Sequence, residues 1–307
     1  MLPNHWLAAL RTAPSLLLSG SRSDNVATAH NPHLPPVRIG GSLSLVLPAH
    51  NEAENIEIVI RQALEVLPRH TDTFEIIPVN DGSQDNTGAI IDRLAAEDDR
   101  VRPVHHEVNR GYGGALKSGF AASRYEHVMF MDADRQFDIA DIQRLAPFVA
   151  THDIVAGFRM ERSDPIHRRV FAEIFNLAVR LLFGVHMRDL DCAFKIFRGE
   201  QLRSLDLTTS GALINAEIQA KLRRQGADLQ QVGVPHYPRV AGSATGGSLR
   251  VILHAMKETI QLWVRMHFYQ PPATAPNPRP YYALGDVLLG VGLGILFVFA
   301  RFFTRRK

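Results

Sequence analysis

Between residues 43 and 159 the sequence alternates short apolar runs with amphipathic segments, and this alternation constrains the fold more than any other feature. The apolar runs have the length of strands and stand at residues 43–49, 74–80, 101–106, 127–131 and 153–158. The segments between them favour helices over residues 52–67, 85–96, 112–124 and 138–149. Such alternation is typical of a mostly parallel sheet with helices on both faces, so we expect an α/β fold.

The composition fits a globular protein with one large domain or two smaller ones, because 46% of the 307 residues are hydrophobic and 21% are charged. A net charge of +3 is too small to favour nucleic acid as a partner. The single cysteine, Cys192, excludes an internal disulfide framework and a cysteine zinc site, and it suits a reducing compartment.

The second half of the chain is less regular. It predicts a helix over 166–184, a strand over 189–198 and a helix over 211–225 that ends at Gly226. An amphipathic helix over 249–268 follows, and its apolar face either packs on the core or lies on a membrane surface. We therefore expect a leader over 1–42, an α/β domain over 43–245 and an amphipathic interfacial helix within 246–270.

The two ends of the chain depart from the globular pattern. Residues 1–42 lack a basic start and Pro14 interrupts their apolar stretch, so we expect a mobile leader rather than a signal peptide. Residues 281–303 are apolar except for Asp286 and Arg301, over a length that spans a bilayer core. We expect a transmembrane helix there, with a buried core helix or an in-plane anchor as the alternatives.

Polar or glycine-rich stretches follow each of the five predicted strands. They stand at residues 48–52, 80–83, 109–114, 132–136 and 157–159. In sheets of this kind ligands bind at the carboxyl ends of the strands. One such turn is common in any fold, but five in order predict a functional site on one edge.

Two carboxylates, Asp132 and Asp134, follow the fourth strand and are separated by Ala133. If the strand continues, Ala133 points the opposite way and both carboxylates face one ligand. Oxygen ligands favour Mg²⁺ or Mn²⁺, and proteins hold Mg²⁺ with one or two carboxylates plus substrate phosphates. The pair therefore predicts a phosphorylated substrate, most simply a nucleoside diphosphate, whereas a helix N-cap or a turn is the structural alternative.

The second and third strand ends add polar groups to this edge. Asp81 either accepts hydrogen bonds from a base or a ribose, or forms a turn with Gly82. The loop 109–114 lets its backbone approach a ligand closely. No G-K-[ST] motif accompanies this loop, which excludes a P-loop NTPase.

In order and spacing, these motifs resemble the family 2 glycosyltransferases of GT-A fold, and within them the dolichyl- or polyprenyl-phosphate sugar synthases. The resemblance covers residues 43–265 and rests on LVLPAHNEAENI, VNDGSQDNT, NRGYGGALKSGF, MDADRQF, DLDCAFKIFR and HYPRVAG. It implies a Rossmann-like GT-A catalytic domain over 43–245. It also implies inverting transfer of mannose or glucose from a nucleotide sugar to a polyprenyl phosphate, with Mg²⁺ or Mn²⁺ as cofactor.

The resemblance also implies roles for single residues. Those that would line the nucleotide-sugar pocket are Pro48, His50, Glu52, Val79 and Asp81. Those that would hold the metal ion and the diphosphate are Asp132, Ala133, Asp134 and Gln136. Arg159 would face the donor or acceptor phosphates, and Arg239 would belong to a loop that closes over them. Thr245 stands where the family often has a lysine, which puts the phosphate contacts of that loop in doubt.

The nature of the acceptor separates two interpretations. A lipid phosphate is already an anion at pH 7 and needs no base. Basic side chains would then position it, and the candidates are Arg168, Arg169 and Lys195. The alternative is that these three are ordinary surface residues. A hydroxyl acceptor needs a general base, for which Glu217 is the candidate; otherwise Glu217 only pairs with a nearby arginine. A third alternative is a membrane protein that binds sugar nucleotides without catalysis.

Nucleotide sugars are cytosolic, so the resemblance implies a catalytic domain at the cytoplasmic face of a membrane, held by a single pass. The basic residues 305–307 would then lie on the non-cytoplasmic side of the membrane, against the positive-inside tendency. Either the folded domain and the earlier basic residues determine the orientation, or the segment does not cross the membrane. Gly290 and Gly294 form a G-x-x-x-G pattern that predicts pairing of the membrane helix in a homo-oligomer.

Overall fold

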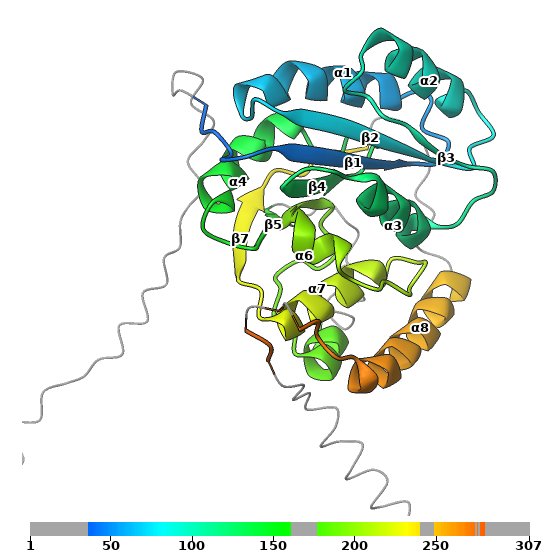
Figure 1. Cartoon of the computed structure of the whole chain (residues 1–307). Helices are drawn as coiled ribbons and strands as arrows, with labels where there is room; N and C mark the ends of the chain where they lie inside the picture. Colours follow the sequence, from blue (N-terminus) through cyan, green and yellow to red (C-terminus); the bar gives the residue numbers. More distant parts are fainter. Residues whose placement is uncertain (1–35, 161–176, 240–248, 274, 276, 280–307) are drawn as a thin grey trace, which may run out of the picture.

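A computed structural model describes residues 36–160, 177–239, 249–273, 275 and 277–279, with the backbone alone for 249–257. Within this part of the chain, seven strands form one sheet in the order β3-β2-β1-β4-β6-β5-β7 (Figure 1). The strands are β1 Leu43–Ala49, β2 Phe74–Asp81, β3 Val104–His106, β4 His127–Met131, β5 Ile154–Arg159, β6 Phe194–Arg198 and β7 Leu229–Val234.

The sheet is mostly parallel, as predicted. β1 lies between β2 and β4 and runs parallel to both, and β2 is parallel to β3 and β5 to β7. β6 is the exception, because it runs antiparallel to both β4 and β5. The chain moves outward from β1 to β3 and returns to β4 on the other side of β1. Ligands in such sheets bind where the strand order reverses, so the carboxyl ends of β1 and β4 are the expected site.

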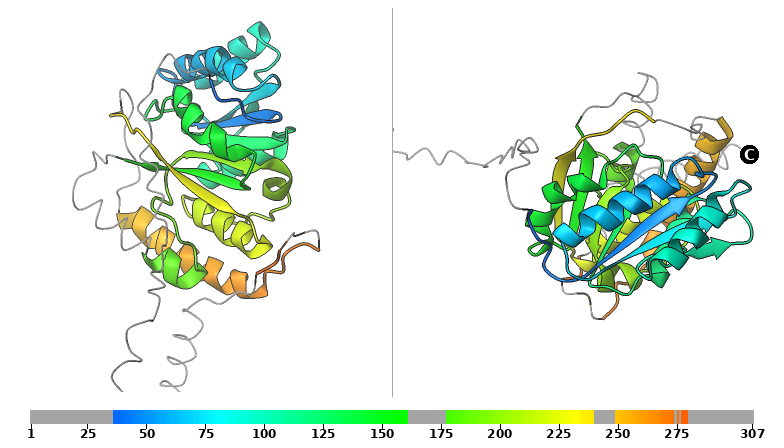
Figure 2. Two further views of the ribbon diagram at one scale, coloured as in Figure 1. Left: turned by 90° about the vertical axis from the view of Figure 1, so that its left-hand side faces the viewer. Right: turned by 90° about the horizontal axis from the view of Figure 1, so that it is seen from above.

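Helices cover both faces of the sheet, as the alternation predicts. They are α1 Ile56–Val66, η1 Leu67–Arg69, α2 Thr87–Glu97, α3 Tyr112–Ala122, η2 Ile139–Asp141, α4 Ile142–Val149, α6 Gly199–Arg203, α7 Ile214–Gln225 and α8 Leu249–Phe268. Figures 1 and 2 show α1, α2 and α4 on one face, and α3, α6 and α7 on the other, with α8 beyond α7. Gly226 ends α7 in the left-handed conformation that its sequence position predicts, with φ of 89°.

Element boundaries differ from the predictions where side chains fix local turns. Residues 52–55 form a turn, so the first helix begins at Ile56 rather than at Glu52. The predicted strand over 189–198 is regular only from Phe194. At the other end of the domain, Ile39 is buried and its N–H donates to His70 O at 2.7 Å, so the domain begins before residue 43.

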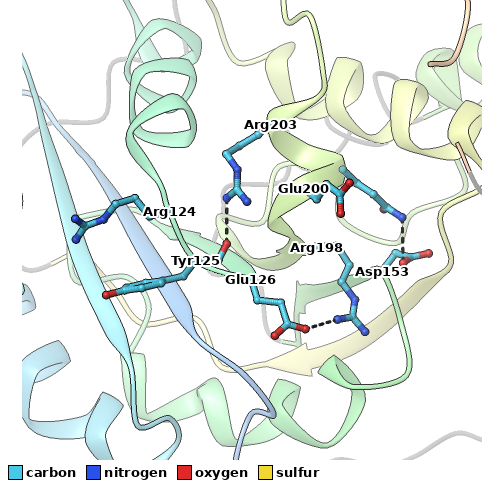
Figure 3. Close-up of a pocket in the computed structure, with 8 residues that line it drawn as sticks. Arg124, Tyr125, Glu126, Asp153, Arg198, Glu200 and Arg203 are labelled. Atoms are coloured by element: carbon cyan, nitrogen blue, oxygen red, sulfur yellow. Dashed lines mark hydrogen bonds and ion pairs between the residues drawn. The ribbon is translucent and has the colours of Figure 1, made fainter. Parts of the chain in front are cut away.

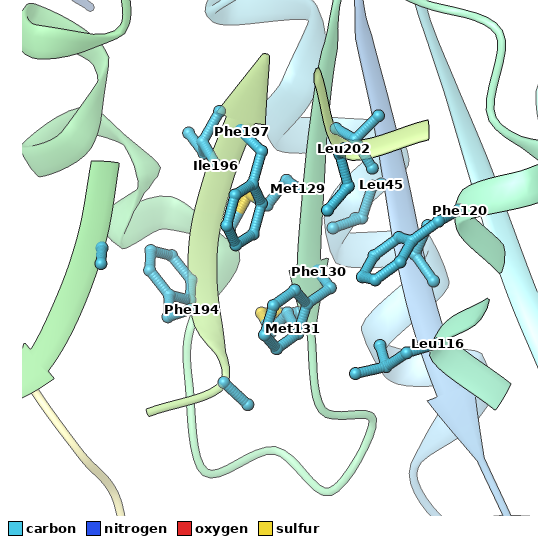
Figure 4. Close-up of a cluster of buried hydrophobic side chains, with 14 of the residues drawn as sticks. Leu45, Leu116, Phe120, Met129, Phe130, Met131, Phe194, Ile196, Phe197 and Leu202 are labelled. Carbon is cyan, nitrogen blue, oxygen red and sulfur yellow. The ribbon is translucent and has the colours of Figure 1, made fainter. Parts of the chain in front are cut away.

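The core lies between the sheet and its helices (Figure 4). Every residue of β1, β2 and β4 is buried, because helices cover these strands on both faces. The Phe130 ring stacks on Phe197 with centroids 6.0 Å apart, and it meets Phe120 of α3 at the same centroid distance. This ring cluster joins β4, β6 and α3. It thereby fixes the position of β4, the strand that directly precedes Asp132.

Among the described residues, none of the helices combines the length and the apolar character needed to cross a bilayer. The predicted transmembrane segment 281–303 lies outside them, as do residues 1–35 of the predicted leader. The amphipathic helix is observed as α8, which buries Leu262 and Met266 against the domain. Its exposed apolar side chains are Ile260, Val264 and Phe268, four residues apart, so α8 packs on the core with one face and leaves a second apolar face exposed.

Candidate functional site

Asp132 and Asp134 lie at the carboxyl end of β4, next to the end of β1. β4 ends at Met131, before the pair, and Ala133 between the two carboxylates is buried in the core. Arg135 adopts φ of 62° and turns the chain sharply after the pair. Asp134 Oδ1 accepts the Gln136 N–H at 3.0 Å, which holds this turn closed.

The two carboxylates differ in their partners. Asp134 Oδ2 receives Arg239 Nη2 at 2.5 Å. The Tyr112 side chain lies near Asp132, whose Oδ1 is shielded from solvent and has no hydrogen-bond partner. Burial, followed by the charge of Asp134, raises the pKa of Asp132 to about 7. Asp132 is therefore a carboxylate whose ionised form lacks a sufficient counter-charge.

The donor set at this turn fits a hard divalent cation. An adjacent Mg²⁺ or Mn²⁺ would give Asp132 Oδ1 the partner that it lacks, with Asp134 as a second oxygen ligand. Gln136 is partly exposed beside them, and its Nε2 donates to Tyr237 O at 3.4 Å. Nowhere in the described ranges do three or more His, Cys, Asp or Glu side chains gather to hold a metal. Substrate oxygens or water would thus complete the coordination.

Arg239 lies between the two acidic residues Asp134 and Glu52. Its Nη1 is 3.8 Å from Glu52 Oε1, and its guanidinium remains partly exposed. The position is set by the backbone, since Tyr237 N donates to Gln136 O at 3.0 Å and ties this segment to the turn after β4. Burial raises the pKa of Glu52, although Asn55 Nδ2 donates to its Oε2 at 2.7 Å.

The ends of β1 and β2 form the neighbouring part of the edge. Pro48 and Val79 are paired in register across these strands. His50 Nδ1 donates to Asp81 O at 2.8 Å. Asn51, at φ of 57°, accepts the Gln84 N–H through its Oδ1 at 2.9 Å. The structure thus brings the predicted nucleotide-pocket residues of both strands together at the expected place.

Asp81 is more buried than a direct ligand contact would suggest. Its Oδ1 accepts from His106 Nδ1 at 2.6 Å and from the Arg110 N–H at 2.8 Å. His106 Nε2 in turn lies 2.8 Å from Ser118 Oγ on α3. The carboxylate of Asp81 therefore anchors the start of the loop 109–114, in addition to the turn that precedes Gly82.

That loop leads into α3, which places Tyr112 beside Asp132. Burial, followed by the charge of Asp132, raises the pKa of Tyr112 well above its ordinary value, so the hydroxyl stays a donor. Tyr112 was not among the site residues predicted from the sequence. The available signal was one aromatic hydroxyl inside a glycine-rich loop, and it became informative only when the fold brought residues 112 and 132 together.

Arg159 is placed at the end of β5, but its guanidinium is held by a carboxylate. Its Nε and Nη2 donate to the two oxygens of Asp189 at 2.6 and 2.8 Å, and both side chains are largely buried. This bidentate pair ties β5 to the segment that precedes β6. Arg168 and Arg169, predicted to bind the acceptor phosphate, lie outside the described residues.

Lys195 lies in the core, so the alternative that it is an ordinary surface residue is wrong. Its side chain is fully buried, and Nζ donates to Leu190 O at 2.9 Å and to Cys192 O at 2.5 Å. Burial lowers its pKa. β6 lies between β4 and β5 in the sheet, and its residues from Phe194 to Phe197 are all buried. Lys195 therefore holds the 190–192 backbone, and its charge also acts on Asp132.

Glu217 is likewise placed for a structural contact rather than for a general base. The side chain is fully buried, and both oxygens accept hydrogen bonds from the backbone and hydroxyl groups of Thr208 and Thr209, at 2.8 to 3.0 Å. Lys221 Nζ lies 2.7 Å away and is the pairing cation, in place of the arginine expected. Burial alone would raise the pKa of Glu217, but hydrogen bonds from Lys221 and Thr209 outweigh it and lower the pKa.

A cavity of about 370 Å³ opens at the opposite edge of the sheet, by the start of β4 and the end of β6 (Figure 3). Its lining residues are Arg124, Tyr125, Glu126, Asp153, Arg198, Glu200, Gln201 and Arg203. Arg198 pairs with Glu126 at 2.8 Å, and Arg203 Nη1 donates to Tyr125 O at 3.0 Å. None of the predicted site residues lines this cavity, so its size does not mark the chemical centre.

The site at the carboxyl edge agrees with a match between residues 44–218 and the model of the family described as "Glycosyl transferase family 2". The chain belongs to glycosyl transferase family 2. The matched range covers the chain from Ser44 in β1 through β6 and includes the edge residues from Pro48 to Gln136.

Curated relatives of this family 2 chain include polyprenyl-phosphate sugar transferases. It is 32% identical over 234 residues to glycosyltransferase AglD of Haloferax volcanii, covering 73% of this chain and 37% of the relative. It is 35% identical over 159 residues to an undecaprenyl-phosphate 4-deoxy-4-formamido-L-arabinose transferase of Pseudomonas fluorescens, covering 51% and 46%. An undecaprenyl-phosphate mannosyltransferase of Micrococcus luteus is 26% identical over 210 residues, covering 65% and 85%.

The chain thus spans less than half of the first two relatives. Among solved structures, it resembles glucosyl-3-phosphoglycerate synthase from Mycobacterium tuberculosis in complex with Mn²⁺ and uridine diphosphate. The TM-score is 0.57 at 22% identity, covering 80% of this chain and 88% of the other. This likeness supports the GT-A type of α/β fold for the family 2 domain described above.

Proposed function

We propose that this chain is an inverting glycosyltransferase that moves a sugar, mannose or glucose, from a nucleotide sugar to a polyprenyl phosphate at the cytoplasmic face of a membrane. The observation that carries the proposal is the paired carboxylate turn of Asp132 and Asp134. This turn lies where the strand order reverses. Asp132 Oδ1 lacks a hydrogen-bond partner there, and Arg239 pairs with Asp134. Relatives named as undecaprenyl-phosphate transferases support the acceptor class.

On the donor side, Asp132, Asp134 and Gln136 would hold Mg²⁺ or Mn²⁺ together with the diphosphate. When bound, such an ion neutralises the charge that develops on the departing nucleoside diphosphate. Arg239, partly exposed beside Asp134, would transfer its contact to the diphosphate oxygens as the sugar–oxygen bond breaks. His50 and Glu52 would border the nucleotide, with Val79 and Asp81 deeper in the pocket.

The environment of Glu217 supports a phosphate acceptor over a hydroxyl acceptor. A general base must reach the proton that it removes, and the Glu217 carboxylate is enclosed by Thr208, Thr209 and Lys221. A lipid phosphate attacks as an anion and needs no such base. Attack on the anomeric carbon from the side opposite the diphosphate would invert the linkage and give a β-linked lipid phosphate sugar.

We further propose that α8 rests at the membrane surface. Its exposed row of Ile260, Val264 and Phe268 faces away from the domain and precedes the apolar segment 281–303, which we propose as an anchor. Pairing of two chains through Gly290 and Gly294 remains part of this proposal. Such an arrangement would bring the transferase to a lipid whose phosphate lies at the interface.

The test is a transfer assay with the full chain in membranes or detergent. Labelled UDP- and GDP-sugars are supplied one at a time with Mn²⁺ and undecaprenyl or dolichyl phosphate, and lipid-extractable label is measured. We expect label in the lipid fraction with at least one donor, and none with Asp134→Asn. If every donor gives neither lipid product nor slow donor hydrolysis, the proposal fails.

A further inference from the structure

We propose that His106 is a positioning residue for Asp81, and that it leaves one carboxylate oxygen, Asp81 Oδ2, to bind the base of the nucleotide sugar. One free oxygen accepts a single ring N–H, so the base that it selects is uracil rather than guanine. This selection rests on the proposed function, since it concerns the nucleotide pocket assigned there, and it narrows the donor to a uridine diphosphate sugar.

The place of Asp81 along the sheet favours contact with a base. Asp81 ends β2, and β1 separates that strand from β4, which precedes the carboxylate turn of Asp132 and Asp134. Neighbouring strands stand about 4.8 Å apart, so the end of β2 lies roughly 10 Å across the sheet from this turn. In a nucleotide the ribose separates the diphosphate from the base. A donor whose diphosphate lies at the turn therefore brings its base to Asp81.

The two hydrogen bonds that the Asp81 carboxylate accepts end on the same oxygen. Oδ1 accepts His106 Nδ1–H at 2.6 Å and the Arg110 N–H at 2.8 Å. Oδ2 accepts none from the described residues and is not sealed from solvent. An ionised carboxylate has about two lone-pair sites on each oxygen. Those of Oδ1 are filled, so Oδ2 is the oxygen that remains for a ligand.

The imidazole of His106 is fixed at both ring nitrogens. An ionised carboxylate only accepts hydrogen bonds, so Nδ1 carries the proton that it donates to Asp81. Nε2 lies 2.8 Å from Ser118 Oγ on α3. His106 is buried, and its backbone pairs in register with Asp81 between β3 and β2. Because the strand and α3 hold the ring, the ring in turn fixes the orientation of the carboxylate.

The loop after β3 holds Asp81 from a second direction. Gly82, at φ of 66°, follows Asp81, and a Cβ on it would lie 2.5 Å from Asn109 N and 2.6 Å from Val108 C. Only glycine therefore allows the turn after β2 to lie directly against this loop. Since the same loop supplies the Arg110 N–H to Oδ1, the carboxylate cannot rotate to exchange its oxygens without moving the loop.

A single free oxygen distinguishes uracil from guanine. Uracil presents one ring N–H, at N3, between two carbonyl oxygens. Guanine presents two adjacent donors, N1–H and the N2 amino group, which match both oxygens of a carboxylate in a bidentate pair. With Oδ1 occupied by His106 and Arg110, Asp81 cannot form that pair. One guanine donor would then be buried without an acceptor, a cost that uracil does not incur.

The test measures the binding of UDP and of GDP to the full chain with Mn²⁺ by isothermal titration calorimetry. We expect the wild type to bind UDP at least about tenfold more tightly than GDP, as one unpaired buried donor dictates. His106→Ala should weaken UDP binding about tenfold and bring the ratio of the two affinities close to one, because a freed carboxylate can offer both oxygens. A general loss of stability would weaken both nucleotides and leave the ratio unchanged.

Three further variants complete the test. His106→Asn keeps an N–H near the place of Nδ1 and should recover part of the preference for UDP. Ser118→Ala removes only the support of Nε2 and should lower the ratio about threefold, which keeps the test decisive if His106→Ala does not fold. The matched control is His152→Ala, since His152 lies 3.7 Å from Asp228 beside the starts of β5 and β7. It should keep the wild-type ratio.

The outcomes separate the positioning role from the proposed function. A wild-type ratio in both His106→Ala and Ser118→Ala would overturn the positioning role. Equal affinities of the wild type for UDP and GDP, or tighter binding of GDP, would overturn the selection of uracil alone. If the wild type with Mn²⁺ binds neither nucleotide, the proposed function falls as well.

Discussion

Arg239 Nη2 lies 2.5 Å from Asp134 Oδ2, which joins residues that stand 105 positions apart in the chain. Glu52 lies on the other side of the same guanidinium. The arginine thus contacts an acid after β4 and an acid after β1, at the two strand ends that flank the reversal of strand order. A group in this place can neutralise either a carboxylate or the phosphates of a donor.

Arg239→Ala should therefore lower turnover about 100- to 1000-fold, which is the range found when one group that stabilises a departing anion is removed. Arg239→Lys keeps the charge but loses the planar fork, so it should retain part of the activity. The measurement is the rate of labelled sugar transfer at saturating donor. Arg69→Ala, an exposed arginine of η1, is the matched control and should transfer at the wild-type rate; an equal loss there would remove Arg239 from the mechanism.

Glu217→Gln should lower the free energy of unfolding by roughly 2 kcal/mol at pH 7, because charge-assisted hydrogen bonds from Lys221 and Thr209 are lost. The folded-state pKa of Glu217 lies below its ordinary value of 4.5. Its contribution is therefore present above pH 4.5 and is lost as the pH falls through the lower folded-state pKa. Urea denaturation at several pH values should show the difference between the two proteins shrinking in acid. A difference that grows in acid would contradict this assignment.

Lys195→Met should destabilise the fold without a selective effect on the acceptor. The substitution leaves the carbonyls of Leu190 and Cys192 without their donor, at a cost of about 1–3 kcal/mol for each buried group. Thermal unfolding and the KM for polyprenyl phosphate are the two measurements. A normal melting temperature with a strongly raised acceptor KM would instead restore Lys195 as an acceptor contact.

Phe268→Asp should raise the KM for polyprenyl phosphate presented in vesicles, because it places a charge on the exposed apolar row of α8. The KM for a short-chain acceptor that is soluble in water should be the same in Phe268→Asp and in the wild type. Ile58→Asp on α1 is the matched control, since Ile58 is an exposed apolar residue on the opposite face of the sheet. Equal effects on both acceptors would argue that α8 does not contact lipid.

The sheet and the carboxylate turn could be predicted because their signals are local and repeat along the chain. Apolar runs ending in polar turns identify parallel strands, and the geometry of such sheets then places Asp81 and Asp132 on one edge. The direction of β6 could not be predicted, since a short strand with the sequence FKIFR is compatible with either orientation. Lys195 was expected to position an acceptor phosphate or to lie on the surface, whereas β6 lies inside the sheet and the Lys195 side chain is fully buried.

Contacts between distant segments account for the other differences. Nothing near Arg159 in the sequence indicates that Asp189 will occupy its guanidinium. Tyr112 and Asp132 likewise lie near each other only because α3 packs on β4, where Phe120 meets Phe130. Glu217 was expected to act as a general base or to pair with an arginine, and nothing in its helix indicated that residues 208–209 would enclose its carboxylate.

The most direct measurement of the central claim is metal-dependent transfer of labelled sugar to polyprenyl phosphate by the wild type, Asp132→Asn and Asp134→Asn. We predict that wild-type transfer requires Mg²⁺ or Mn²⁺ and stops on chelation. The transfer rate of each variant should be at least about 100-fold lower than that of the wild type. Circular dichroism should show that the fold of each variant is unchanged. Asp72→Asn, an exposed carboxylate distant from the site, should transfer normally. Transfer at the wild-type rate by either variant, or undiminished transfer after chelation, would contradict the account.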